Sequence, residues 1–300
     1  MKTADEYILY PENVTESLSI DEVCLSKGEL YTIVTNKNER VSNKGSLVAM
    51  IKGTDSKKII EVLNKIPGST RNNVKEITME MARNMGHAAD LCFPNAQKVI
   101  DRFHVVRLVT DAMQHLRIQY RWQAIEQENT MIKKAKERKE KYIPEVFENG
   151  DTLKELLARS KFLFYKFKTE WTNTQTQRAE ILFKNYPLLS TAYDLVVLFR
   201  TIYKSKSIGQ ARLRFNHWMY EVLKSKIDVF NTCVNSLEYH LDNILNFFAN
   251  RETNANAESF NSKIKQFRSE VRGVRDSKFF LFRLEKLFAG QPPPKKQLTH

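Results

Sequence analysis

The hydrophobic pattern of this chain changes once, at residues 93–106 (FPNAQKVIDRFHVV), and that change limits the folds open to it. Before this stretch the pattern is typical of short strands with short helices between them. After it, for well over half of the chain, the spacing is helical. The stretch itself is predicted to be a turn followed by a short apolar strand that ends in Asp101. A carboxylate is therefore expected at the rim of a sheet, where open α/β sheets bind their ligands.

Seven elements are predicted before the helical region, in the order β-β-β-α-β-α-β. The strands are expected at 18–25, 30–35, 46–52, 74–79 and 99–100, and the helices at 55–66 and 82–92. Three strands joined by short loops form an antiparallel meander, and the strand-helix-strand units should be right-handed parallel crossovers. This order is that of a ribonuclease-H-like fold, an α/β architecture with a mixed sheet in which acids at neighbouring strand ends converge.

The chain is predicted to divide into five segments along its length. These are a short lead (1–18), the first part of the core (19–121), a long all-helical insertion (122–249), a completion of the core (250–289) and a disordered tail (290–300). Polar, cap-forming residues mark the end of the insertion, and a proline run marks the tail. Within the insertion, aromatic residues at helical spacing are expected in a core rather than on a base-stacking platform.

The net charge of +13 and the pI of about 9.5 favour a polyanionic partner, most often nucleic acid. The alternative is a basic surface that only keeps the protein soluble. Three widely spaced cysteines without a CxxC pair indicate reduced thiols and argue against a zinc finger. Neither a signal peptide nor an apolar run of membrane-spanning length is apparent. We therefore expect a soluble cytoplasmic protein without membrane contact.

Four acids stand where the predicted elements could bring them together. Asp21 lies in the first strand, Glu80 and Asp101 end the fourth and fifth strands, and Glu258 lies on a helix after the insertion. Carboxylates on rigid elements suit Mg²⁺ or the similar Mn²⁺. Two such ions about 3.5–4 Å apart can activate a nucleophile and stabilise the leaving oxygen of a phosphoryl transfer. Each acid alone is unremarkable, so the prediction rests on their arrangement.

Three segments closely resemble the signature blocks of a known family: SIDEVCLSKGELYTIV, FPNAQKVIDRFHVV and NANAESFNSKIKQFRSEVRG. The family is the ISL-three family of bacterial insertion-sequence DDE transposases, in particular its ISAon-type branch. The resemblance extends over residues 19–287. It implies a ribonuclease-H-like catalytic core interrupted by a helical insertion. It also implies Mg²⁺-dependent cleavage of insertion-sequence ends and joining of the 3′ hydroxyl to target DNA.

By this resemblance, Asp21 matches the first catalytic aspartate and Glu258 the catalytic glutamate, and both would hold metal together with Glu80. The family's second aspartate normally begins an Asp-Met pair after the fourth strand, where this chain has Glu80 and Met81. A glutamate is one methylene longer, and a misplacement of about 1 Å can cost on the order of 10² in rate. The sequence therefore leaves open whether Glu80 weakens the enzyme or reaches the ion in another rotamer.

The D-x-x-H element that such transposases carry after the fifth strand is matched by Asp101 and His104, and it is credited with assisting at the cleaved DNA. The alternative for His104 is a buried histidine that ties the strand end to the next helix. The alternative for Glu258 is a surface carboxylate near a helix N-terminus, which the helix dipole favours. DNA contacts are expected from seven residues around the site, although a solvated basic face is the alternative. They are Arg102, Asn261, Lys263, Lys265, Arg268, Arg272 and Arg275.

The sequence therefore predicts the catalytic subunit of a DDE transposase, acting on DNA as a homo-oligomer near the nucleoid. A second hypothesis is a catalytically weakened or inactive remnant that only binds DNA or oligomerises. A third is a ribonuclease-H-like nuclease or resolvase, against which the insertion and the third block argue. Family members usually begin with a zinc-binding, helix-turn-helix region that reads transposon ends. We expect a separate N-terminal partner to supply that region.

Overall fold

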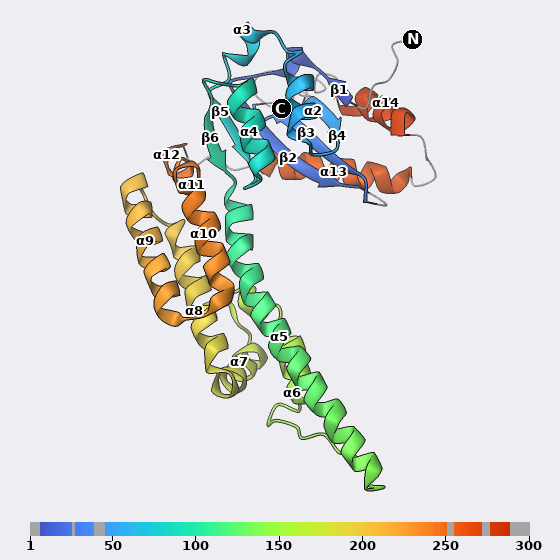
Figure 1. Cartoon of the computed structure of the whole chain (residues 1–300), viewed down its shortest axis with the longest axis vertical. Helices are drawn as coiled ribbons and strands as arrows, with labels where there is room; N and C mark the ends of the chain where they lie inside the picture. Colours follow the sequence, from blue (N-terminus) through green and yellow to red (C-terminus); the bar gives the residue numbers. More distant parts are fainter. Residues whose placement is uncertain (1–6, 26–27, 39–45, 251–254, 272–276, 289–300) are drawn as a thin grey trace, which may run out of the picture. The chain divides into compact units, whose positions relative to one another are not determined.

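Residues 7–25, 28–38, 46–250, 255–271 and 277–288 are described in the computed structural model of the chain. The chain forms two compact units (Figure 1). The first, which we call the sheet unit, consists of Met1–His104 and Asp242–His300, and the second, the helical unit, of Val105–Leu241. A helical unit thus interrupts the sheet unit in the sequence. The predicted segment boundaries stay predictions, and the predicted tail lies outside the described residues.

The sheet has six strands in the order β1-β4-β3-β2-β5-β6. The first four are antiparallel neighbours, whereas β5 runs parallel to β2 and β6 parallel to β5. The bounds are Tyr7–Leu9 (β1), Ser17–Cys24 (β2), Leu30–Asn36 (β3), Leu47–Lys52 (β4), Glu76–Met79 (β5) and Gln97–Ile100 (β6). The mixed sheet confirms the predicted ribonuclease-H-like α/β fold. The edge strand β1 was not predicted, because three residues carry too little alternation to be recognised.

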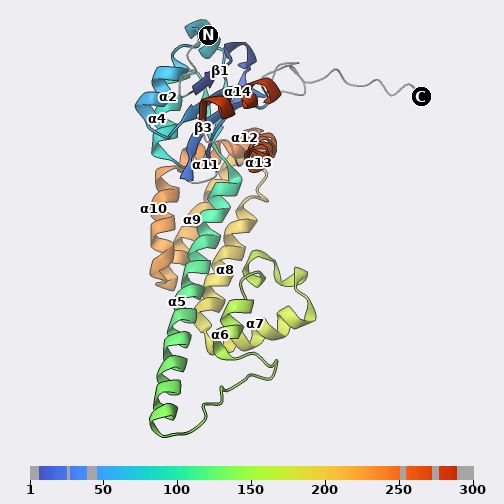
Figure 2. The same cartoon turned by 90° about the vertical axis from the view of Figure 1, so that its right-hand side faces the viewer.

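Helices cover both faces of this sheet (Figures 1 and 2). On one face, α2 (Ser56–Leu63) packs against β4 and α4 (Arg83–Cys92) against β5, with the four-residue α3 (Gly68–Arg71) between them in sequence. On the other face, α13 (Ala255–Glu270) packs against β2 and α14 (Ser277–Phe288) against β1. The second interface is apolar: its buried cluster contains Val23, Tyr31, Ile33, Met50, Phe260, Ile264, Phe267, Phe280 and Leu284. It holds α13 over the strand that carries Asp21.

A long helix, α5 (Arg102–Glu137), starts directly after the last strand and continues into the helical unit. That unit also contains α6 (Leu153–Arg159), α7 (Asn173–Asn185), α8 (Pro187–Ile202), α9 (Ile208–Ser225) and α10 (Asn231–Tyr239), and α5 lies along the others (Figure 2). Two short helices, α11 (Leu241–Leu245) and α12 (Phe247–Asn250), follow. Phe199, Phe215 and Trp218 are fully buried between α8 and α9, as their spacing predicted.

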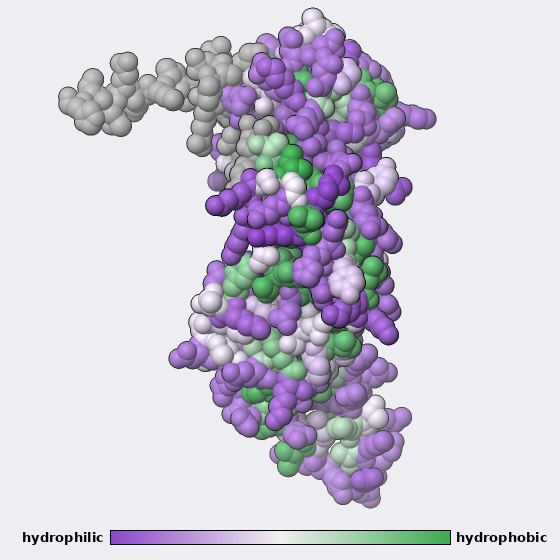
Figure 3. Space-filling view, turned by 90° about the vertical axis from the view of Figure 1, so that its left-hand side faces the viewer, coloured by the Kyte–Doolittle hydropathy of each residue, from purple (hydrophilic) through white to green (hydrophobic). Residues whose placement is uncertain are grey.

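Most of the surface on the face shown in Figure 3 is hydrophilic, and hydrophobic residues form smaller patches among the polar ones. Among the residues that the structure describes, none of the helices combines the length and the apolar character needed to cross a bilayer. All three cysteines are free thiols, and only Cys24 is exposed.

Candidate active site

The register of three neighbouring strands places three acids at one level of the sheet. The residue before Asp21 lies opposite the last residue of β5, which in turn lies opposite the last residue of β6. One position further on, Asp21, Glu80 and Asp101 are therefore level with one another. Residues at the same level of parallel strands point to the same face. The strand register alone thus gathers three carboxyl groups at the carboxyl ends of β5 and β6.

His104, in the first turn of α5, lies between two of these acids. Its Nε2 atom is 4.0 Å from Asp21 Oδ1, and its Nδ1 atom is 3.7 Å from Glu80 Oε2. One ligand atom from each of these three residues lies within 4.8 Å of the other two, so together they could hold a metal ion. Asp101 is not part of this group of three. The structure therefore brings together Asp21, Glu80 and His104, all of which the sequence had singled out.

The carboxylate of Asp21 is buried and held from two sides. Its Oδ1 atom accepts a hydrogen bond from the backbone N–H of Glu22 at 2.8 Å, and its Oδ2 atom accepts one from Asn261 Nδ2 at 2.5 Å. Burial raises the pKa of Asp21, although nearby His104, the two hydrogen bonds and the charge of Lys265 act in the opposite direction. The side chain is thus well oriented but disfavoured as an anion, and a bound cation would relieve that cost.

Asp101 is more deeply buried, with only 4% of its surface exposed. Its Oδ1 atom accepts a long hydrogen bond of 3.4 Å from the backbone N–H of Phe103, at the start of α5. Its Oδ2 atom is buried without a hydrogen-bond partner, and so is Asn261 Oδ1. Burial raises the pKa of Asp101, and the charge of Asp21 adds to this, while Phe103, His104 and Lys37 oppose it. Two acceptor atoms near the acids are therefore left without a donor.

A family model described as "Transposase", that of the ISL-three type of DDE transposases, matches residues 18–284. The chain belongs to the ISL-three family of DDE transposases. The matched range begins in β2, which carries Asp21, and ends in α14, so it includes the acids, the helical unit and α13. No curated protein matches the chain. The assignment of this transposase to the ISAon-type branch stays a prediction.

The structure of the transposase adds one buried cation that the sequence did not single out. Lys37 follows β3, and its Nζ atom donates to Glu76 Oε1 and to Thr78 Oγ1, both at 2.8 Å. Glu76 and Thr78 alternate with Glu80 along the same face of β5. Lys37 thus places a positive charge on the face of the sheet that carries the acids. In the sequence it is one lysine of a polar, basic loop, and only the fold shows that it points inward.

Two of the predicted DNA contacts have internal partners instead. Arg268 is buried, and its guanidinium forms hydrogen bonds of 3.0–3.2 Å with the carboxylate of Glu29 and lies 4.9 Å from the ring centroid of Phe280. Asn261 is also buried and donates to Asp21. Packing of α13 on the sheet turns both side chains inward, and their role as DNA contacts stays a prediction.

The remaining predicted site residues are either exposed or outside the described part of the structure. Arg102, Lys263 and Lys265 are exposed, the first at the start of α5 and the other two on α13. Glu258 also lies in α13, but its side chain is outside the described part of the structure. Arg272 and Arg275 lie outside the described residues. Phe260, Ile264 and Phe267 form the buried side of α13, as their spacing predicted.

Proposed function

We propose that this transposase cleaves insertion-sequence ends and joins the resulting 3′ hydroxyl to target DNA, with Asp21, Glu80 and Glu258 holding Mg²⁺ or Mn²⁺. The observation that carries the proposal is the convergence of Asp21, Glu80 and His104 within 4.8 Å, at the sheet edge of a transposase fold. The excess of 48 basic over 35 acidic residues suits a DNA substrate.

The donor atoms fit a divalent cation. Carboxylate oxygens are the ligands that Mg²⁺ prefers, and burial raises the pKa of Asp21 although His104 and Lys265 act in the opposite direction, so a bound cation would stabilise the ionised form. When bound, the ions would supply Lewis-acid stabilisation of the charge on the attacking and leaving oxygens. The unpartnered Oδ2 atom of Asp101 can accept a hydrogen bond from water in the shell of an ion or from the DNA.

His104 has a different part in this proposal. Imidazole suits zinc and similar metals better than magnesium, so we assign His104 to proton transfer or to a DNA oxygen rather than to the metal. Its two ring nitrogens lie 4.0 Å from Asp21 and 3.7 Å from Glu80, distances that allow electrostatic attraction but are longer than a hydrogen bond. We assign Asn261 a positioning role, because its Nδ2 atom donates the hydrogen bond that orients Asp21 through Oδ2.

Glu80 supports an active rather than a decayed site. Its carboxylate lies 3.7 Å from His104 and within 4.8 Å of a ligand atom of Asp21. The extra methylene therefore does not carry this carboxylate out of the cluster. A glutamate that acts as a metal ligand has to keep its carboxylate in this cluster. Replacing Glu80 with the shorter aspartate tests the alternative of a weakened site.

Strand transfer tests the function directly. The protein is mixed with pre-cleaved ends of the element that encodes it and with plasmid DNA, in Mg²⁺ or Mn²⁺. We expect joined products that disappear in Asp21→Asn and in Glu258→Gln. If joining is absent in the natural protein but present in Glu80→Asp, the site is weakened. Absence of joining in both proteins would contradict the proposal and favour a protein that only binds DNA.

Metal binding can be tested without activity. A ligand at 100 times its dissociation constant stabilises the folded state by about 2.7 kcal/mol. We expect Mg²⁺ or Mn²⁺ to raise the melting temperature of the natural protein, EDTA to reverse the rise, and Asp21→Asn to abolish it. Asp151→Asn, in the helical unit, is the matched control and should keep the rise. An equal rise in Asp21→Asn would show that the ion binds elsewhere.

A further inference from the structure

Two cations of the helical unit lie over one aromatic ring, and a third precedes the residue of that ring in the chain. The guanidinium carbon of Arg200 lies 4.0 Å from the ring centroid of Phe167, and Lys204 Nζ lies 5.3 Å from the same centroid. Lys166 precedes Phe167 in the chain, and its Nζ atom is 3.4 Å from Gln175 Oε1. Among the described residues, none of these three cations forms an ion pair with a carboxylate. We call them the Phe167 cluster.

The cluster differs from those cations of the helical unit that form ion pairs. Examples are Arg107, which pairs with Asp111 at 3.3 Å, and Lys168, which pairs with Asp194 at 3.5 Å. Like charges that share one ring repel each other, and a cation–π contact offsets only about 0.5–2 kcal/mol of that cost. The Glu170 carboxylate accepts a hydrogen bond from the backbone N–H of Phe167 but, within the described part of the chain, forms no ion pair with these cations. Cations that lack an ion pair are suited to bind an anion from outside.

The backbone that carries the cluster is fixed. The segment between α6 and α7 has only short 3₁₀ turns, but two side chains of α8 hold it by hydrogen bonds. Arg200 donates to the carbonyl oxygen of Tyr165 at 3.1 Å, and Tyr193 Oη donates to that of Lys166 at 2.9 Å. Trp171 Nε1 donates to the carbonyl oxygen of Leu163 at 3.1 Å and closes the segment on itself. The cations thus stand on a preorganised segment rather than on a free loop.

The same segment carries a further exposed pair of a cation and an aromatic ring. Lys161 Nζ lies 5.4 Å from the ring centroid of Phe162, and 65% of Phe162 is exposed. A run of alternating cations and aromatic rings on a fixed surface is typical of proteins that bind a nucleic-acid backbone, because the cations neutralise phosphates and the rings contact sugars or bases. A small anion would need neither the extended run nor the exposed ring.

We propose that Lys166, Arg200 and Lys204, extended by Lys161, form a second DNA-binding surface that contacts the sugar-phosphate backbone without reading sequence. This inference rests on the proposed function only in that DNA is the substrate. It needs neither the metal nor the acids, which belong to the sheet unit. Contacts with phosphates fix the position of DNA but carry no direct sequence information.

The test measures DNA affinity by fluorescence anisotropy, with the full chain, a labelled duplex and EDTA. The triple variant Lys166→Gln, Arg200→Gln, Lys204→Gln should bind on the order of tenfold to a hundredfold more weakly near 0.1 M salt. The slope of log K against log salt should fall by about 2–3, since each lost phosphate contact removes about 0.9. The losses should be similar for unrelated DNA sequences.

A charge-matched control separates this surface from general basicity. Lys133, Lys134 and Lys136 are exposed near the end of α5, and their triple glutamine variant removes the same charge. We expect it to change the salt slope by less than about 1. Equal losses in the two triple variants would overturn the proposal, because a general effect of net charge would then explain both.

A second variant covers the case in which loss of Arg200 disturbs the fold. Lys166→Glu with Lys204→Glu leaves Arg200 on Phe167, and circular dichroism checks that the helical content is retained. Unchanged affinity in this folded variant would also overturn the proposal. The result of the binding test does not depend on strand transfer. If the variants bind DNA more weakly but neither they nor the natural protein join strands, the proposed surface is supported and the proposed function is contradicted. Joining together with normal binding by all variants would reject this surface alone.

Discussion

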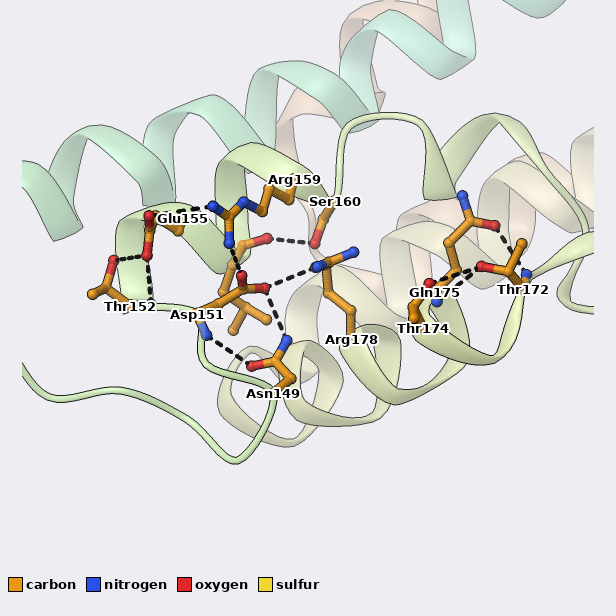
Figure 4. Close-up of polar contacts among 11 residues, drawn as sticks. Asn149, Asp151, Thr152, Glu155, Arg159, Ser160, Thr172, Thr174, Gln175 and Arg178 are labelled. Atoms are coloured by element: carbon orange, nitrogen blue, oxygen red, sulfur yellow. Dashed lines mark hydrogen bonds and ion pairs between the residues drawn. The ribbon is translucent and has the colours of Figure 1, made fainter.

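Both units of the molecule contain buried carboxylates, and two of these, Asp151 and Asp101, differ in how fully they are hydrogen-bonded. In the helical unit, Asp151 is 1% exposed, and it accepts hydrogen bonds from Arg178 Nε and Asn149 Nδ2 at 2.8 Å and from Arg159 (Figure 4). Burial opposes its ionisation, but the hydrogen bonds and charges of the two arginines hold the pKa of Asp151 below its ordinary value. The fold thus provides this carboxylate with a full set of donors.

In the sheet unit, Asp101 is nearly as buried but has one weak donor and an Oδ2 atom with none, and burial raises its pKa. A buried group without partners costs free energy, so its retention needs a reason. The comparison shows that this chain can satisfy a buried acid completely. On the proposed function, the unpartnered Oδ2 atom of Asp101 belongs to a site that takes up a cation and DNA.

The largest expected difference concerns activity. Asp21→Asn removes a proposed metal ligand, and we expect the rate of strand joining to fall by about 10³-fold or more, equivalent to about 4 kcal/mol in the barrier. Asp151→Asn should leave the rate per folded molecule within about twofold, because it touches no reacting atom. Single-turnover joining assays measure both. Similar losses in the two variants would break the distinction between a functional and a structural acid.

The next difference concerns stability. Asp151→Asn leaves Arg178 without its countercharge in a buried network, and we expect the free energy of unfolding to fall by about 2–3 kcal/mol. Urea denaturation, with hydrogen exchange of α6 and α7 as a local probe, measures this loss. Asp21→Asn is the comparison and should destabilise the metal-free protein by less than about 1 kcal/mol. A loss of that small size in Asp151→Asn would contradict the structural role.

The smallest expected difference is one of pH dependence, with opposite signs for the two acids. The pKa of Asp151 is lowered in the folded state, so its stabilisation is present above the ordinary aspartate value of 3.8 and is lost as the pH falls. The pKa of Asp101 is raised, so ionisation destabilises the metal-free fold as the pH rises above that value. The two acids should therefore respond oppositely to replacement by asparagine.

Melting curves in EDTA between about pH 4 and 8 test these signs. Asp101→Asn should raise the melting temperature near neutral pH by about 2–4 °C, and the gain should shrink toward acid pH. Asp151→Asn should lower the melting temperature, and that loss should also shrink toward acid pH. A gain in Asp101→Asn that does not depend on pH would mean that packing, rather than the buried charge, is responsible.

The sequence could predict those features that depend on residues close together in the chain. The helix starts at Thr152 and Thr172 follow from local pairs with Glu155 and Gln175 three residues later (Figure 4). The order of strands and helices along the chain, apart from β1, follows from local patterns as well. Each of these features depends on residues that are close in the chain, so the type of side chain and its spacing are sufficient.

The rest depends on contacts between distant residues. Asn261 meets Asp21 across 240 positions, and Arg268 meets Glu29 across 239. On a helical wheel both side chains could equally face solvent, and a lysine such as Lys37 in a polar loop gives no sign that it is buried. Only the packing of α13 on the sheet decides these orientations, and a periodic pattern in one segment does not contain that information.

The separation of 240 positions between Asp21 and Asn261 also corresponds to a time interval during synthesis of the chain. A ribosome adds about 5–20 residues each second, so the strand that carries Asp21 exists for on the order of 10–50 s before Asn261 is made. During synthesis the first acids can already stand side by side, while the hydrogen bond that orients Asp21 cannot yet form. A chain that is released before Asn261 therefore has these acids without the hydrogen bond that orients Asp21.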